Sequence, residues 1–309
     1  MMPKISIIMP VFNRAVSVGR ALNSLLVQSY QQFEVVIVDD GSTDNSVEII
    51  RPYLSDPRFR LVQLERNSGV NHARNRGLSS IDSDSVWVTF LDSDDEFVTD
   101  ALENIVSVIS EHPNLHDYCF SVRYIDGRSA SELAAAYKIF HYQDLFDVAV
   151  KPKGEWVHVI DARLIRNRTF HYEESVRNGF EAIAYLRLAK DYAVLYSSKI
   201  VRLYHVDVEG LTRIKNKTSA KSRDEILGYS VYLKEFGDML YLHNKIEYAL
   251  VHAVLGKTFL EVDDFKQCLQ STYRALRCNP LEPRVYRNIL LMLKHTFFSL
   301  FNLRTSSSK

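Results

Sequence analysis

Residues 33–46 have the sequence FEVVIVDDGSTDNS, and this stretch decides the fold that we expect. Its first part, residues 33–38, is an apolar run of strand length that stops at the pair Asp39-Asp40. The polar residues at 42–45 are types that begin helices, because their side-chain oxygens accept hydrogen bonds from the free N–H groups of a first turn. The stretch therefore predicts a buried strand, an acidic turn and a helix in direct succession.

The same order of strand, turn and helix repeats on both sides of this stretch. Apolar runs of strand length alternate with segments whose apolar residues recur at helical spacing. The expected strands are 5–9, 33–38, 59–64 and 86–91, and the expected helices are 16–27, 42–50 and 71–78. Strands that alternate with helices in this way are typical of βαβ units. We therefore expect an α/β domain built on a mostly parallel sheet.

The pattern changes after residue 91 and becomes wholly helical towards the C-terminus. The elements expected next are a helix at 99–110, a strand at 119–125, a helix at 181–190 and a strand at 200–206. The polar stretch 215–223 has the composition of a linker, and no strand pattern follows it. We therefore expect the α/β domain to occupy residues 1–215 and an all-helical region to occupy residues 216–309.

The composition argues against several classes of protein. Lysine plus arginine and aspartate plus glutamate each number 38, whereas a nucleic-acid binder usually needs a basic excess to contact phosphates. The three cysteines show no C-x-x-C spacing, which argues against a disulfide framework or a cysteine zinc site and favours a reducing compartment. No apolar run reaches the roughly 18 residues of a membrane span. These features favour a cytoplasmic enzyme without a nucleic-acid partner.

The motifs of several enzyme classes are absent from the sequence. No two glycines are two residues apart, which excludes the dinucleotide fingerprint and a kinase-type glycine loop. The sequence also lacks a phosphate loop that ends in Gly-Lys-Ser/Thr, a Gly-x-Ser-x-Gly elbow and a His-Glu-x-x-His helix. Nicotinamide oxidoreductases, P-loop hydrolases, α/β-hydrolases and zinc proteases are therefore not expected.

Acidic residues stand where two of the expected strands end. Asp39-Asp40 follows one strand, and the cluster Asp92–Asp95 follows another. In an open α/β sheet, ligands bind beyond the carboxyl ends of the strands. Carboxylates there can accept hydrogen bonds from a base or a ribose and can hold a hard cation that bridges phosphates. The alternative role is to cap and charge the next helix, and it is the better interpretation of Asp95 and Glu96.

Four blocks of sequence resemble, in order and spacing, the family 2 glycosyltransferases. The blocks are 7–14 (IIMPVFNR), 36–44 (VIVDDGSTD), 67–77 (NSGVNHARNRG) and 90–95 (FLDSDD). Weaker similarity continues to about residue 213. The resemblance implies a GT-A fold, with a Rossmann-like nucleotide-binding sheet. It also implies an inverting transfer of a sugar from a nucleotide-sugar donor, assisted by Mg²⁺ or Mn²⁺.

The resemblance also implies roles for residues in these blocks. Pro10 and Phe12 would lie along the nucleotide, and Asp40 would accept a hydrogen bond from its base. Arg74 resembles the arginine that lies near the nucleotide, and a surface arginine on a helix is the alternative. Asp92-x-Asp94 resembles the DxD motif of the family, in which Asp92 would face the ribose and Asp94 would bind the cation directly.

The catalytic base of the family is usually an aspartate in a Glu-Asp pair that precedes a helix with an aromatic-Leu-Arg-Leu pattern. Here Phe180 and Glu181 precede the matching residues 185–188. Glu181 aligns with the base, and its carboxylate can take the proton of an acceptor hydroxyl. Phe180 departs from the family pattern, and a charged cap on a buried helix is the alternative role for Glu181. His205 resembles a histidine that some members place near the metal or the diphosphate, with a packed core histidine as the alternative.

The C-terminal helical region contains two further patterns. Residues 265–280 resemble half of a tetratricopeptide repeat, but one unit is visible and stable arrays need about three. Residues 288–304 combine apolar runs with basic residues, which suits a helix in a membrane interface. Packing on the other helices or on a second subunit, as in a homo-oligomer, is the alternative. We expect this region to cap the catalytic domain, to form an oligomer contact or to touch the inner face of the membrane.

Together these features predict a metal-dependent inverting glycosyltransferase. Its donor would be a nucleotide-sugar, and a UDP-sugar is favoured. Its acceptor would be a hydroxyl of a glycan or of a lipid-linked sugar. Surface polysaccharide synthesis is the expected context. The alternative is a protein that kept the fold but lost the base, and that binds a nucleotide-sugar or a partner without catalysis. A sugar-nucleotide pyrophosphorylase ranks lower, because its glycine-rich phosphate loop is missing.

Overall fold

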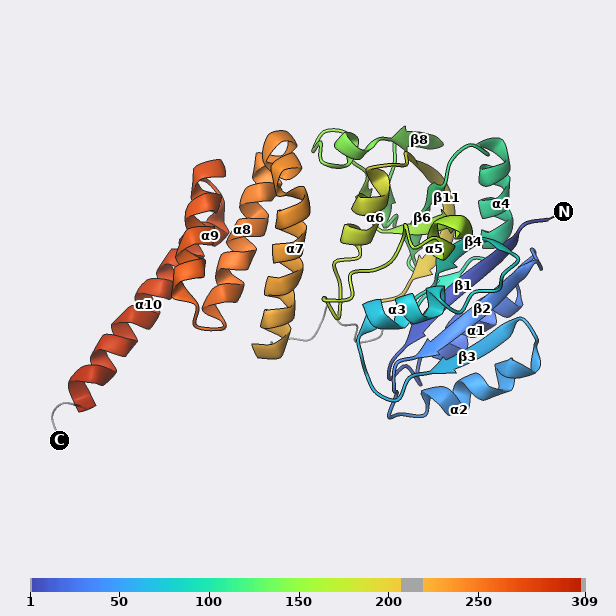
Figure 1. Cartoon of the computed structure of the whole chain (residues 1–309), viewed down its shortest axis with the longest axis horizontal. Helices are drawn as coiled ribbons and strands as arrows, with labels where there is room; N and C mark the ends of the chain where they lie inside the picture. The colour runs from blue at the N-terminus through green and yellow to red at the C-terminus, as the bar shows by residue number, and fades with distance from the viewer. Residues whose placement is uncertain (1, 207–218, 307–309) are drawn as a thin grey trace. The chain divides into compact units, whose positions relative to one another are not determined.

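The computed structural model describes residues 2–206 and 219–306, which form two compact units. Residues 146–148 belong with the C-terminal helices, and the rest of residues 2–206 forms the first unit. In Figure 1 the first unit runs from blue to yellow, and the C-terminal helices run from orange to red.

A nine-stranded sheet lies at the centre of the first unit. Its order is β3-β2-β1-β4-β10-β6-β11-β5, and β8 pairs with β11 outside this path. The strands are β1 (Lys4–Val11), β2 (Phe33–Asp39), β3 (Phe59–Gln63), β4 (Ser85–Phe90), β5 (Glu96–Phe97), β6 (Asp117–Tyr124), β8 (Tyr137–Phe140), β10 (Trp156–Asp161) and β11 (Val194–Tyr204). β3, β2, β1 and β4 pair in parallel, whereas β10 runs antiparallel between β4 and β6. The expected α/β architecture with a mostly parallel sheet is therefore confirmed, and a separate pair of short strands, β7 (Ser131–Glu132) and β9 (Lys153–Gly154), lies beside it.

Helices cover both faces of this sheet because the central strands are apolar on both faces. The helices are α1 (Val18–Leu26), α2 (Ser46–Ile50), α3 (Val70–Leu78), α4 (Ala101–Glu111), α5 (Ala162–Arg166) and α6 (Ala182–Ala189), with short 3₁₀ turns at Arg51–Ser55 and Tyr142–Leu145. Successive side chains of a strand point to opposite faces, so Ile7 of β1 packs with α1 and α4 while Ile8 packs with α3, α5 and α6. Gly77 lets α3 approach closely, because a Cβ there would lie 2.5 Å from Ile8.

Strand β11 begins at Val194, well before the expected start at residue 200. Its first half carries the polar residues Ser197, Ser198 and Lys199, which break the apolar pattern. The register with β6 shifts between Ser197 and Ile200, so the chain forms an irregularity there and continues as the same strand. The sequence pattern therefore revealed only the second half of this strand.

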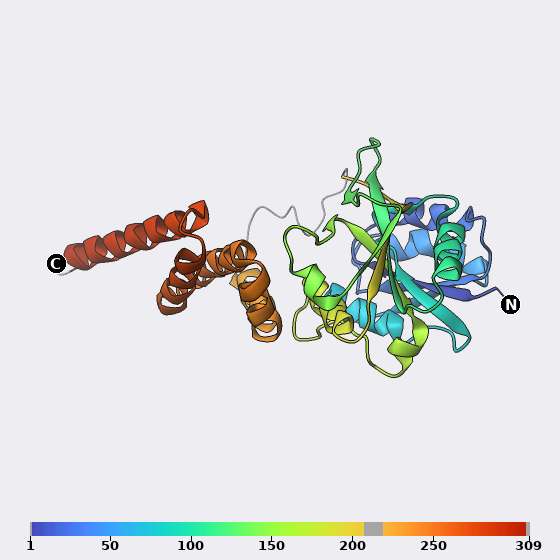
Figure 2. The ribbon, with the colours of Figure 1, turned by 90° about the horizontal axis from the view of Figure 1, so that it is seen from above.

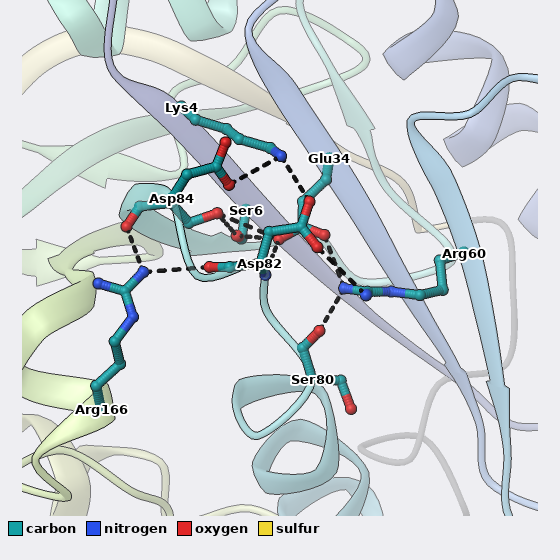
Figure 3. A network of polar contacts seen from close by, with 9 residues as sticks. Lys4, Ser6, Glu34, Arg60, Ser80, Asp82, Asp84 and Arg166 are labelled. Carbon is teal, nitrogen blue, oxygen red and sulfur yellow. Dashed lines mark hydrogen bonds and ion pairs between the residues drawn. The ribbon is translucent and has the colours of Figure 1, made fainter.

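A polar network ties together the amino-terminal ends of β1, β2 and β4 (Figure 3). Glu34 of β2 is buried, and its carboxylate accepts hydrogen bonds from Ser6 at 2.6 Å and from Arg60 at 2.7 Å. Lys4 pairs with Asp82 at 2.5 Å, and Arg166 of α5 donates to the carbonyl oxygens of Asp82 and Ser85. This network fixes the loop ahead of β4. The network lies at the amino-terminal ends of the strands, whereas the acidic residues Asp39-Asp40 and Asp92–Asp95 lie at the carboxyl ends.

The second unit is built from four helices, drawn from orange to red in Figure 2. They are α7 (Ser219–His243), α8 (Lys245–Leu260), α9 (Phe265–Cys278) and α10 (Pro283–Ser306). Asn244 and Asp264 cap α8 and α9 by accepting hydrogen bonds from backbone N–H groups at 3.0 Å. Gly256 lets α8 approach α9 closely, because a Cβ there would lie 2.9 Å from Thr272. Among the described residues, no helix is both long enough and apolar enough to cross a membrane.

Candidate active site

Asp40 lies directly after β2 and fixes the loop ahead of α3. Its two carboxylate oxygens accept hydrogen bonds from the backbone N–H groups of Ser68 at 2.7 Å and Gly69 at 2.8 Å. Burial raises the pKa of Asp40, and these hydrogen bonds oppose the rise. Gly41 follows with a φ of 71°, and a Cβ there would lie 2.6 Å from the backbone of Arg66. The turn therefore requires glycine, and it holds Asp40 against the loop that begins α3.

Pro10 and Phe12 lie at the end of β1, beside this turn. The backbone N–H of Asp40 donates to the carbonyl oxygen of Val11 at 2.8 Å, which joins the ends of β1 and β2. Pro10 is buried, whereas the ring of Phe12 is 37% exposed. An accessible aromatic ring therefore lies at the same edge of the sheet as the Asp40 carboxylate.

Arg74 lies on α3 and directs its guanidinium at two carboxylates. Its Nη2 donates to Asp92 Oδ1 at 3.0 Å, and its Nη1 donates to Glu181 Oε1 at 2.7 Å. The guanidinium also lies over the ring of Tyr172, 5.3 Å from its centroid. The sequence singled out Arg74, Asp92 and Glu181 in three separate segments, and the structure brings the three together.

Glu181 lies directly before α6, after a turn with an uncommon backbone. Gly179 has a φ of 76° and Phe180 a φ of 59°, in the left-handed region that non-glycine residues rarely adopt. The side-chain amide of Asn71 donates to the carbonyl oxygen of Gly179 at 3.0 Å. Helix α3 therefore holds this turn through two side chains. Asn71 donates to the backbone of the turn, and Arg74 donates to the side chain of Glu181.

Asp92 and Asp94 follow β4 and lie in different electrostatic environments. Burial acts to raise the pKa of Asp92, but Arg74 and Arg202 outweigh it and hold that pKa below its usual value. Burial raises the pKa of Asp94, and the charge of Asp92 raises it further, although Arg14 Nε lies 3.5 Å from its carboxylate. The charge of Asp94 is therefore the less compensated of the two.

Arg202 of β11 lies between these acids, and it was not among the residues predicted for the site. Its Nη1 lies 3.5 Å from Asp92 Oδ2, and its Nε lies 3.4 Å from Asp95 Oδ2. Burial raises the pKa of Asp95 to about 7, even though Arg202 opposes the rise. The expectation that Asp95 and Glu96 cap a helix is wrong, because α4 begins only at Ala101. The Asp95 carboxylate is buried against Arg202, and Glu96 lies in β5. The available signal was an arginine between two apolar residues of an expected strand.

His205 lies at the same acidic loop but pairs with a residue other than the DxD acids. Its Nε2 lies 2.6 Å from Glu96 Oε1, and its backbone N–H donates to Asp95 Oδ1 at 3.1 Å. Glu96 also forms an ion pair with Arg20, whose Nε lies 3.5 Å from Glu96 Oε1. The structure thus places His205 within this cluster, and a contact between its ring and a cation stays a prediction.

The acids after β4 have the chemistry of a site for a hard divalent cation. Asp92, Asp94 and Asp95 offer carboxylate oxygens, the ligands that Mg²⁺ and Mn²⁺ prefer. Within the part of the chain that the structure describes, the buried Oδ2 of Asp95 makes no hydrogen bond, and Nε of Arg202 at 3.4 Å is its ion-pair partner. The repulsion from Asp92 that raises the pKa of Asp94 is also what a divalent cation would relieve. The residues present therefore fit a divalent cation.

Most of the sheet that carries this site matches a known family. Residues 6–171, more than half of the chain, match the model of the glycosyl transferase family 2. This chain is a family 2 glycosyltransferase. The resemblance carried by the four sequence blocks is thereby confirmed.

Curated relatives of this glycosyltransferase match parts of its length. An uncharacterized glycosyltransferase of Haemophilus influenzae is 47% identical over 103 residues, which are 33% of this chain and 40% of that protein. The GalNAc(5)-diNAcBac-PP-undecaprenol beta-1,3-glucosyltransferase of Campylobacter jejuni is 28% identical over 210 residues, 66% of this chain and 65% of that protein. The putative teichuronic acid biosynthesis glycosyltransferase TuaG of Bacillus subtilis is 33% identical over 144 residues, 46% and 56% of the two chains. The matches thus span less than two thirds of these relatives.

Solved structures of TarS from S. aureus resemble the fold. TarS 1-349 in complex with UDP-GlcNAc matches with a TM-score of 0.59 at 19% identity, over 91% of this chain and 82% of that chain. The complex of TarS 1-349 with UDP gives a TM-score of 0.58 at 18% identity. Identity this low supports the fold alone, which is the GT-A type expected from the sequence.

Proposed function

We propose that this glycosyltransferase moves a sugar from a nucleotide-sugar, with UDP-sugars as the first candidates, to a hydroxyl of a glycan or lipid-linked acceptor with inversion at the anomeric carbon. Mg²⁺ or Mn²⁺ would assist the transfer. The observation that carries the proposal is the bridge from Asp92 through Arg74 to Glu181. In that bridge a carboxylate suited to proton transfer lies next to a guanidinium suited to a diphosphate.

The nucleotide would lie along the edge formed by the ends of β1 and β2. Phe12 offers an exposed ring for the nucleoside, with Pro10 buried behind it. Asp40 would accept a hydrogen bond from the base, since each carboxylate oxygen has a second lone pair beyond the one used by the loop ahead of α3. Arg74, which is buried and shared between two acids, would bind the diphosphate.

The cation would be held by Asp94, with Asp92 towards the ribose and His205 as a further contact. When bound, a divalent cation neutralises the charge that develops on the departing diphosphate. Support comes from the poorly compensated charge of Asp94. Arg14 and Arg202 balance the remaining negative charge of this loop.

Glu181 would act as the general base. Its carboxylate takes the proton of the acceptor hydroxyl as that oxygen attacks the anomeric carbon. The bond from this carbon to the diphosphate breaks, and its electron pair leaves with the diphosphate. Arg74 holds the Glu181 carboxylate through a 2.7 Å hydrogen bond, which orients it before the acceptor binds.

We further propose that the helical region 216–309 brings the enzyme to a membrane that carries its acceptor. On α10, Tyr286, Leu290 and Leu293 recur at helical spacing and are 53%, 54% and 63% exposed. The sequence from residue 283 to residue 309 contains no aspartate or glutamate, and its arginines and lysines are Arg284, Arg287, Lys294, Arg304 and Lys309. A basic helix with an exposed apolar face favours an anionic lipid surface. The C. jejuni relative is named for an undecaprenol-linked acceptor, which is consistent with this location.

The membrane proposal is tested by sedimentation with lipid vesicles. We expect the protein to bind vesicles that contain phosphatidylglycerol more tightly than neutral ones, and the pair Leu290→Glu and Leu293→Glu to abolish binding. If a second copy of the chain covers this face instead, the protein will not bind vesicles and will be a dimer in solution.

The donor proposal is tested by thermal unfolding with nucleoside diphosphates and sugar nucleotides, each with Mn²⁺ and with a chelator. A ligand at about a hundred times its dissociation constant should stabilise the protein by roughly 2.7 kcal/mol. We expect a metal-dependent shift with one nucleotide, and its loss in Asp94→Ala but not in the exposed control Asp126→Ala. The absence of any shift, or an undiminished metal-dependent shift in Asp94→Ala, contradicts the proposal.

A further inference from the structure

Asp117, Cys119 and His158 form a cluster on strands that the donor site does not use. Asp117 and Cys119 lie on β6, and His158 lies directly opposite Cys119 on β10. His158 Nδ1 lies 3.0 Å from Asp117 Oδ1 and 3.3 Å from Cys119 Sγ. One ligand atom from each residue lies within 4.8 Å of the other two.

We propose that these three residues bind a zinc ion. Thiolate, imidazole and carboxylate are the ligands that zinc takes in proteins. Atoms bound at about 2.0 to 2.3 Å to a tetrahedral ion lie roughly 3.3 to 3.6 Å from one another. The separation of 3.3 Å between His158 Nδ1 and Cys119 Sγ is that of such an edge, while the 3.0 Å to Asp117 Oδ1 is shorter. The sulfur also lies 3.4 Å from His158 Nε2, so the imidazole has to turn for Nδ1 and the other two atoms to bind one ion.

The charges of the cluster also favour a divalent cation. Asp117 is 2% exposed and Cys119 is 0% exposed, and among the described residues the ion-pair partner of Asp117 is His158, with no lysine or arginine beside it. A buried carboxylate is costly unless a cation or hydrogen bonds compensate it. A zinc ion with one carboxylate, one thiolate and a neutral imidazole carries no net charge. On binding, the S–H bond of Cys119 breaks, the sulfur electron pair forms the zinc–sulfur bond and the proton passes to water.

The alternative is a buried hydrogen-bonded cluster without a metal. Burial raises the pKa of the Cys119 thiol, and Asp117 raises it further, so without a cation the thiol stays protonated. A buried, protonated thiol does not act as a nucleophile. The two alternatives that remain are therefore zinc binding and a purely packed core.

A zinc ion here would stabilise the position of α6, the helix that follows Glu181. The imidazole of His158 stacks on the ring of Tyr185, with centroids 3.5 Å apart and planes at 9°. Tyr185 lies one turn after Glu181 on α6, and its hydroxyl hydrogen-bonds that of Tyr172 at 2.7 Å. An ion that fixed His158 would therefore fix the ring against which α6 packs. The inference does not depend on the donor proposal, because no acid of the DxD loop contributes to the cluster.

The test is elemental analysis of the purified full chain, followed by growth with cobalt in place of zinc. We expect close to one zinc per chain, and in the cobalt form a near-ultraviolet absorption band of a cobalt–thiolate bond. Cys119→Ser should lower the metal content at least tenfold and remove the band. The matched control is Cys268→Ser, which alters a buried cysteine of the helical unit and should leave both unchanged.

A second variant keeps the test decisive if Cys119→Ser fails to fold. Asp117→Asn keeps the shape of the side chain, an oxygen that accepts from His158 and the stack of His158 on Tyr185, and it removes the carboxylate ligand, so it should fold and lose its zinc. Asp94→Ala should keep its zinc, which separates this site from the donor cation. A folded wild-type protein without zinc, or equal metal content in wild type and Asp117→Asn, overturns the proposal.

Discussion

Arg74 joins Asp92 to Glu181, two acids that lie 18 and 107 positions away from it in the sequence. The side chain of Arg74 is 9% exposed, while those of Asp92 and Glu181 are 38% and 37% exposed. The buried guanidinium therefore holds two carboxylates whose other faces remain accessible. One arginine thus links the loop after β4 to the helix that carries the proposed base.

The first prediction concerns this bridge. Lysine carries a single ammonium group and cannot reproduce the fork of two N–H donors, so Arg74→Lys should displace Asp92 and Glu181. We expect kcat/KM for transfer to fall on the order of a hundredfold, since misplacement by about 1 Å has that effect. The control is Arg76→Lys, an exposed arginine on the same helix, which should stay within about twofold of wild type. An Arg74→Lys enzyme of nearly full activity would show that the bridge does not matter.

The second prediction concerns the pH dependence of stability. The pKa of Asp95 is raised to about 7 in the folded protein, above its ordinary value of 3.8. The folded state therefore binds this proton more tightly than the unfolded state, and the stability that it gives is lost as the pH rises from about 4 through 7. Asp95→Asn removes the titration, so the fall in Tm between pH 5 and pH 8 should be smaller in Asp95→Asn than in wild type. Equal pH dependence of the two proteins would contradict the role given to Asp95.

The third prediction concerns the network of Figure 3. Glu34 is 7% exposed at its side chain and accepts hydrogen bonds from Ser6 and Arg60. Glu34→Gln should lower the free energy of unfolding by about 1 to 3 kcal/mol, because buried donors lose a charged acceptor. Urea unfolding measures the change, with the exposed Glu65→Gln as control. Activity per folded molecule should not change, and a loss of activity at full stability would contradict a structural role.

The site residues that directly follow an apolar strand could be predicted from the sequence. The acids Asp40, Asp92 and Asp94 follow apolar runs directly, and a parallel sheet brings the ends of such strands to one edge. Arg74 and Glu181 were found through their surroundings in the sequence, and their contact arises from the packing of α3 beside the turn ahead of α6. Local pattern was therefore sufficient to name these residues but not to pair them.

The residues that were missed depend on strand pairing over long distances. Arg202 lies in the half of β11 that the pattern predicts, but it reaches Asp95 because β11 pairs with β5, and the pattern does not predict that pairing. The cluster of Cys119 and His158 depends in the same way on the antiparallel register of β6 and β10. Such pairs have no fixed spacing in the sequence, so motif searching does not detect them.

The measurement that tests the central claim most directly is the transfer rate of Glu181→Gln with the donor found by thermal unfolding. Glutamine keeps the shape of the side chain but cannot accept the proton. We predict that kcat falls by about 10² to 10⁴-fold, while donor affinity, measured separately, stays within a few-fold of wild type. A rate within a few-fold of wild type would contradict the account, because another group would then have to act as the base.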